Sequence, residues 1–105
     1  MADKKQRSYE TVFIIRPNLD EEAVDRCVAS VEEFIKGQGG VVENTDKKGR
    51  KRLAYEVEKM RDGYYVVIVF KAKPESIGPL KRMMALSEDV IRSLIVVLEE
   101  AALHQ

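Results

Sequence analysis

The sequence predicts a small α+β domain in which two helices cover one face of a four-stranded antiparallel sheet. Three observations predict it. The chain has 105 residues, the length of one small domain. Stretches rich in β-branched and aromatic residues alternate with stretches whose apolar residues recur at helical spacing. Their order along the chain is βαββαβ, the split β-α-β arrangement of ferredoxin-like folds.

The first strand is expected over residues 9–17, YETVFIIRP, because β-branched and aromatic residues dominate it and its final proline stops the ladder. Residues 1–8 carry basic residues and no apolar periodicity, which predicts a flexible N-terminal arm. The first helix begins at Asp20, where acidic residues suit the positive end of the helix dipole. Glycines end this helix. Its apolar stripe consists of Val24, Cys27, Val28, Val31 and Ile35.

A long second strand follows from Val41 to Val57 and changes character at its middle. Its first part is polar and Gly49 interrupts it, so we expect a bulge or a bend there. The strand then resumes as an alternating apolar run. Residues 58–63, EKMRDG, predict a turn, with the Asp-Gly pair as the strongest signal.

The remaining elements complete the second half of the fold. Residues 64–72, YYVVIVFKA, form the most strand-like segment of the chain. A second helix is expected over 74–86, where an internal proline is tolerable only near the first turn. The last strand is expected over 89–100, DVIRSLIVVLEE. A single domain therefore spans residues 9–100, followed by a C-terminal tail, 101–105.

Charged residues indicate which side of each strand is open, because burying an unpaired charge is costly. Three of the expected strands carry charged residues that alternate in phase with one set of the strand's apolar residues. These are Glu10 and Arg16 in the first strand, Lys71 in the third and Arg92 in the last. Those sets are expected to face away from the helices: Val12, Ile14, Tyr65, Val67, Val69, Leu94 and Val96. The opposite sets are expected in the core: Phe13, Ile15, Tyr64, Val66, Ile68, Phe70, Ile91, Ile95 and Val97.

The open face would then carry a contiguous apolar patch, which monomeric proteins seldom leave bare. This pattern favours a face that binds a protein partner. Two alternatives stay open. Sheets often carry some exposed valine, and the alternation could be reversed in one strand.

Catalysis is poorly supported by the sequence. The only histidine, His104, lies in the expected tail, and Cys27 belongs to an apolar helix stripe, which favours a structural thiol. No His, Cys and Asp cluster has metal-ligand spacing. The glycine-rich run 37–40 follows a helix instead of leading into one, so it does not resemble a phosphate-binding loop. The sequence predicts no catalytic residue, no metal and no cofactor.

Composition limits the setting in which the protein works. The 18 Lys and Arg residues balance 18 Asp and Glu residues, so no field of the whole molecule attracts an anion. No apolar window has the length of a membrane span, and the N-terminus lacks the apolar region of a secretory signal. One cysteine rules out an internal disulfide. These features indicate a soluble intracellular protein whose attraction to nucleic acid must come from local clustering.

Positive charge is concentrated in one segment, KKGRKRLAYEV, residues 47–57. Arginine and lysine neutralise phosphates, and tyrosine can stack on an unpaired base or bond a sugar. The alternative is a solvated edge strand on which lysine prevents further strand pairing, but one or two charges suffice for that. The segment therefore favours nucleic-acid binding. The predicted contacts are Lys47, Lys48, Arg50, Lys51 and Arg52, with Tyr55 nearby.

From Tyr9 to Glu100 the chain resembles the bacterial small-subunit ribosomal protein six family. The resemblance rests on YETVFIIRPNL, GRKRLAYEV, DGYYVV and EDVIRSLIVVLEE in this order and spacing. It implies a non-enzymatic role in the small subunit. It also implies binding to the central domain of the small-subunit ribosomal RNA and a heterodimer with ribosomal protein eighteen. The family's basic pair and three further RNA-binding positions map onto Lys51, Arg52, Tyr55, Tyr9 and Arg92.

Two positions depart from the family pattern. Lys48 stands where the family often has tryptophan, and Glu56 stands where it often has proline. The loss of proline restores a backbone N–H, so the second strand could pair further than usual.

Two rival functions share the predicted fold. One is a ferredoxin-like regulatory module that binds a small ligand and dimerises through its open sheet face. The other is an acylphosphatase-like enzyme, suggested only by Arg16 and Asn18 and lacking that family's glycine-rich anion loop. Fold alone does not separate these functions.

Overall fold

In the computed structural model the chain folds in the predicted order βαββαβ. The structure describes residues 6–57 and 60–98, without the side chains of residues 54–57. The elements are β1 (Arg7–Ile15), α1 (Glu21–Gly37), β2 (Val41–Val57), β3 (Met60–Ala72), the short 3-10 helix η1 (Pro74–Ser76), α2 (Ile77–Leu86) and β4 (Val90–Val97).

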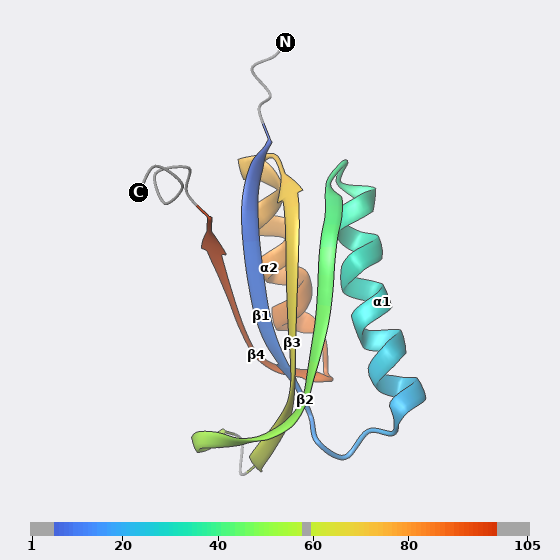
Figure 1. The fold of residues 1–105 in the computed structure, drawn as a ribbon, viewed down its shortest axis with the longest axis vertical. Helices are drawn as coiled ribbons and strands as arrows, with labels where there is room; N and C mark the ends of the chain where they lie inside the picture. The colour runs from blue at the N-terminus through green and yellow to red at the C-terminus, as the bar shows by residue number, and fades with distance from the viewer. Residues whose placement is uncertain (1–5, 58–59, 99–105) are drawn as a thin grey trace.

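The strands form one four-stranded sheet in the order β2-β3-β1-β4, and every neighbouring pair is antiparallel. Figure 1 views the face that the helices leave uncovered, with α2 behind β1 and β3 and α1 beside β2. The central strands are β1 and β3. The edge strands are β2 and β4, so the basic segment of β2 lies at an edge of the sheet.

The sequence signals at both ends of α1 are confirmed. The carboxylate of Asp20 accepts a hydrogen bond from the backbone N–H of Ala23 at 2.8 Å, which caps the helix, and Glu21 and Glu22 lie in its first turn. The predicted apolar stripe is buried against the sheet. In α2, Leu80 and Met84 do the same. Neither α-helix of the described residues is both long and apolar enough to span a membrane.

The predicted alternation between core and open face holds in the two central strands. Side chains of one phase are completely buried between the sheet and the helices: Phe13, Ile15, Val66, Ile68 and Phe70. Thr11 is buried in the same phase, and its hydroxyl donates to the carbonyl oxygen of Leu94 at 3.2 Å. That bond offsets the cost of burying a polar group.

In β4 the core prediction is only partly correct. Ile95 is half-buried and packs against the core, and Ile91 is half-buried. Val97 was expected in the core but is 43% exposed. The physical reason is position, because an edge strand has a neighbouring strand on one side only.

Two predicted boundaries also change. β1 begins at Arg7, so the last two residues assigned to the arm pair with Ala72 and Lys71 of β3. β3 begins at Met60, so Asp62 and Gly63 lie in a strand and not in the predicted turn. The described residues do not include 1–5, 58–59 and 99–105. Most of the predicted arm, and His104 in the predicted tail, therefore fall outside them.

Candidate nucleic-acid and protein interfaces

The basic segment of β2 is bent at its glycine, as expected. Gly49 has a φ of 93°, in the left-handed region that glycine adopts without strain. The pairing of β2 with β3 shifts register between Lys47 and Gly49, which marks a β-bulge. Beyond this bulge the strand bends, so the residues before and after it have different surroundings.

The two lysines before the bulge already have acidic partners. The ammonium group of Lys47 donates to the carboxylate of Asp25 on α1, and this hydrogen bond raises the pKa of Lys47. Lys48 lies 2.9 Å from the carboxylate of Asp46 on the same strand. Both pairs are solvent-exposed and hold the lysines only weakly, but they neutralise part of the local positive charge.

The three basic residues after the bulge have no such partners. Arg50, Lys51 and Arg52 are exposed, and within the described part of the chain they form no ion pair or side-chain hydrogen bond. The sequence presented five equivalent charges. The structure divides them into two with acidic partners and three that remain available to an external anion.

These three residues lie on a two-stranded extension of the sheet. The pairing of β1 with β3 ends where Ile15 faces Tyr64. β2 and β3 continue past this point, with Lys51 facing Gly63 and Arg52 facing Asp62. We call residues 49–53 of β2 and 60–64 of β3 the basic ribbon. Figure 1 shows the two strands running on below the end of β1, with β2 sweeping sideways.

Gly63 explains how the basic ribbon is held against the sheet. A Cβ atom at this position would overlap the Cγ2 of Ile14 and would lie 3.4 Å from the Cδ2 of Leu53. Leu53 is itself buried. The side chains of Ile14 and Leu53 therefore meet over a backbone that has no side chain. Sequence reasoning missed this contact, because an Asp-Gly pair is also the usual signal of a hairpin turn.

The aromatic residues near the predicted RNA contacts lie in different surroundings. Tyr9 is 4% exposed, and its ring stacks on Phe70 with 5.6 Å between centroids, so the structure places it in the core and not on an RNA-facing surface. Tyr65 faces Gly49 and Tyr64 faces Arg50, so both tyrosines lie on the strand paired with the basic segment. The side chain of Tyr55 lies outside the described residues.

The apolar residues expected on the open face lie in contiguous rows. Val12 of β1 lies between Val67 of β3 and Leu94 of β4. The adjoining rows join Ile14 to Tyr65 and Arg92, and Glu10 to Val69 and Val96. Leu94 is 61% exposed, while Val12, Ile14, Tyr65, Val67 and Val69 are half-buried by their neighbours. We call this surface the open-face patch: Val12, Ile14, Tyr65, Val67, Val69, Leu94 and Val96.

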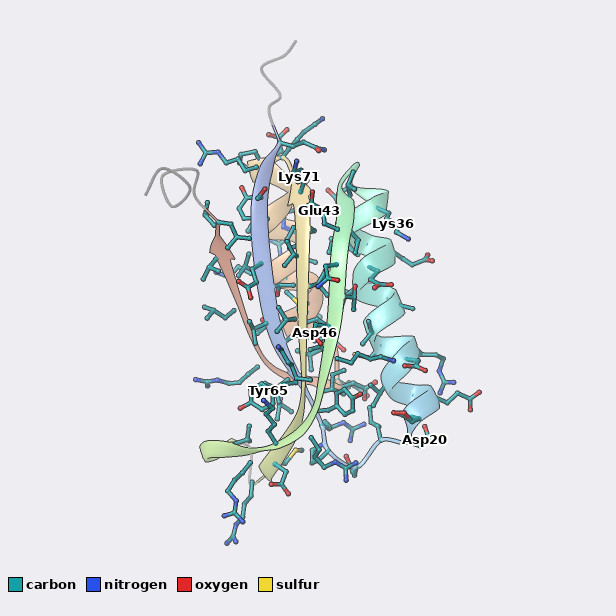
Figure 2. All side chains as sticks on the ribbon, in the orientation of Figure 1. Asp20, Lys36, Glu43, Asp46, Tyr65 and Lys71 are labelled. Carbon is teal, nitrogen blue, oxygen red and sulfur yellow. The ribbon has the colours of Figure 1, made fainter. Side chains whose placement is uncertain are left out.

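Charged residues border the open-face patch. Lys71 and Glu43 form an ion pair at 3.6 Å near one end of the sheet, and Tyr65 lies toward the other end (Figure 2). Arg92 is exposed on β4 and, with Val12, Ile14, Ser93 and Leu94, lines a shallow hollow. The patch thus has an apolar centre and a polar rim, the usual organisation of a protein interface.

Other reactive groups have structural explanations. The guanidinium of Arg16 donates to the carboxylate of Asp89 at 2.8 Å, which joins the end of β1 to the start of β4. Cys27 is buried, and desolvation, together with the charge of Asp89, raises its pKa to about 11 from 9.0. A thiol with such a pKa is a poor nucleophile. Among the described residues, no group of His, Cys, Asp and Glu side chains could hold a metal ion.

Comparison with known proteins gives a consistent result. Residues 8–97 match the sequence model of the family Ribosomal protein S6. The small ribosomal subunit protein bS6 of Moorella thermoacetica is 49% identical over 96 residues, covering 91% of this chain and 98% of that protein. The same protein of Clostridium novyi is 44% identical over 90 residues, covering 86% and 95%. The crystal structure of 30S ribosomal protein S6 from Thermotoga maritima superposes with a TM-score of 0.86 at 29% identity, covering 95% and 92%.

Proposed function

The chain belongs to the ribosomal protein S6 family of small-subunit proteins, and from this premise we propose that it binds both ribosomal RNA and another ribosomal protein. The RNA is the central domain of the small-subunit ribosomal RNA, contacted by the basic ribbon. The protein is ribosomal protein eighteen, which covers the open-face patch. Its role is structural and not enzymatic, and it acts in the cytoplasm, in the ribosome.

One observation carries the RNA part of the proposal. Arg50, Lys51 and Arg52 are exposed, adjacent and without acidic partners among the described residues, on a ribbon that projects from the sheet. The chain as a whole has no net charge, so this concentration is local. Phosphate contacts need positive charge at the contact and not over the whole protein.

The protein part rests on the open-face patch. Seven apolar side chains lie in adjoining rows of three strands, and the helices cover only the opposite face. A partner that buried Leu94 and Val96 would remove their exposed apolar surface from water, a gain of about 25 cal/mol per Å² before the costs of association. Arg92 lies at the border of the patch, opposite Ile14.

The RNA proposal is tested with the assembled heterodimer, because the protein partner could supply much of the affinity. We expect the variant Arg50→Ala/Lys51→Ala/Arg52→Ala to fold normally, since exposed basic side chains add little stability. If all three contact phosphate, the slope of log affinity against log salt falls by roughly 2 to 3 units. Affinity is measured by filter binding or anisotropy at several salt concentrations.

A matched control removes the same charge elsewhere. Lys36, Lys81 and Arg82 are exposed on the two helices, and their triple alanine variant should keep the wild-type slope. Equal affinity and equal slope for the ribbon variant and wild type would overturn the RNA proposal. The basic residues would then serve only to keep the β2 edge from pairing with other strands.

A further inference from the structure

The three exposed basic residues of β2 in the basic ribbon, Arg50, Lys51 and Arg52, do not lie on one surface. In an antiparallel pair, residues directly opposite each other point to the same face, and successive residues of one strand point to opposite faces. Arg50 is opposite Tyr64, which packs against the core on the helix side of the sheet. Arg52 is opposite Asp62 and follows Arg50 by two residues, so it shares that side.

Lys51 projects from the other side. It is opposite Gly63, whose α-carbon faces the side chains of Ile14 and Leu53. Ile14 belongs to the open-face patch, so Lys51 lies on the open side. Arg61 is two residues before Gly63 on β3 and shares the open side by the same alternation.

The charge is therefore divided between the two sides of a thin element. The helix side carries Arg50 and Arg52, with Asp62 as the acidic residue on the same side. The open side carries Lys51 and Arg61. The ribbon is two strands wide in this region because β1 has already left the sheet. Both sides of the ribbon carry exposed basic residues.

We propose that the basic ribbon lies between two segments of RNA backbone, with Arg50 and Arg52 on one segment and Lys51 and Arg61 on the other. This inference rests on the proposed RNA-binding role and adds the geometry of the contact. Side chains on opposite sides of a strand pair point away from each other, so the charged groups of the two pairs are well separated. An RNA backbone lying against one side would not reach the basic residues on the other side.

The geometry also restricts the RNA that fits. The major groove of a regular A-form helix is deep and narrow, and side chains cannot read it. A two-stranded ribbon fits between two backbones only where the helix is opened by a bulge, an internal loop or a meeting of helices. The class of ligand is thus an irregular RNA duplex with two phosphate backbones facing each other, and not a single strand or a continuous duplex.

Directed cleavage from adjacent positions tests the proposal. In a Cys27→Ala background, single variants Arg61→Cys and Asp62→Cys place an iron chelate on the open and the helix side of the same strand. Each is assembled with ribosomal protein eighteen and a central-domain ribosomal RNA fragment, and the RNA is then mapped for hydroxyl-radical cuts. We expect two sets of cuts, on nucleotides far apart in the RNA sequence. One shared set of nucleotides would overturn the two-sided contact.

Charge variants separate this inference from the RNA role itself. Arg50→Ala/Arg52→Ala should lower the salt slope by about 2 units and Lys51→Ala by about 1, with the effects adding in the triple variant. If the Arg pair alone accounts for the whole loss and Lys51→Ala has none, the protein binds RNA with one side only, and the two-sided proposal fails while the RNA role stands. If no variant changes the slope, both fail.

Discussion

The two faces of the sheet are built from alternate residues of the same strands, yet they do different things. In β3, Val66 and Ile68 are fully buried under the helices, whereas Val67 and Val69 between them are half-buried on the open face. Composition hardly distinguishes the faces, since both are aliphatic. What distinguishes them is cover. One apolar surface stabilises the fold, and an equally apolar surface is left uncovered by the helices.

The largest expected effect comes from placing one charge on each face at adjacent residues. Ile68→Lys buries an unpaired ammonium group and should destabilise the protein by more than about 4 kcal/mol, enough to unfold much of it. Val67→Lys places the same group beside Asp46, which it faces across the β2–β3 pair, and should cost about 1 kcal/mol or less. Urea unfolding of both variants measures the difference.

The Val67→Lys variant also tests the partner face. It should bind ribosomal protein eighteen at least about tenfold more weakly, because it places a charge at the centre of an apolar contact. A folded variant with unchanged affinity would exclude this face from the interface. A loss of stability as large as that of Ile68→Lys would show that Val67, and not Ile68, is buried under the helices.

A smaller effect is expected where the open face is itself packed, at Gly63. Gly63→Ala forces a methyl group against Ile14 and Leu53, and overpacking of this kind costs about 1–3 kcal/mol. Gly78→Ala is the matched control. Gly78 lies in α2 with no heavy atom within 4 Å of an added Cβ, so alanine should be neutral or stabilise the helix by up to about 1 kcal/mol.

Thermal unfolding of the two glycine variants distinguishes a packed ribbon from a loose one. If the two variants melt at the same temperature, the basic ribbon is not held by Ile14 and Leu53. The salt slope for RNA should also change in Gly63→Ala if the ribbon is displaced, but not in Gly78→Ala.

The smallest effect concerns the thiol beneath the covered face. Burial raises the pKa of Cys27 to about 11, so above pH 9 the thiol ionises more readily in the unfolded chain than in the folded one. Its contribution to stability is complete below pH 9 and is lost as the pH rises toward 11. The stability of wild type relative to Cys27→Ala should therefore fall across this window. A difference that does not vary with pH would mean that the thiol is not shielded from water.

Local sequence was sufficient for the secondary structure of the central elements. The position of Asp20, the stripe from Val24 to Ile35 and the alternation around Ile68 each depend on residues within a few positions of one another. Helix capping and the two-residue period of a strand act over that same range. These features were therefore correctly predicted. The family was also correctly predicted, from the resemblance of four motifs in their order and spacing. Val97 was not, because its exposure depends on the absence of a second neighbouring strand.

The candidate sites needed the tertiary structure. The sequence by itself determined that Lys47 to Arg52 are basic and that Tyr9 is aromatic. It did not determine that Lys47 reaches Asp25 across 22 positions, or that Tyr9 stacks on Phe70 in the core. Which charges remain available, and on which side of the ribbon they lie, depends on the register between β2 and β3, and the bulge at Gly49 shifts that register. A one-residue shift moves a side chain to the opposite face, so only the paired strands decide where each charge points.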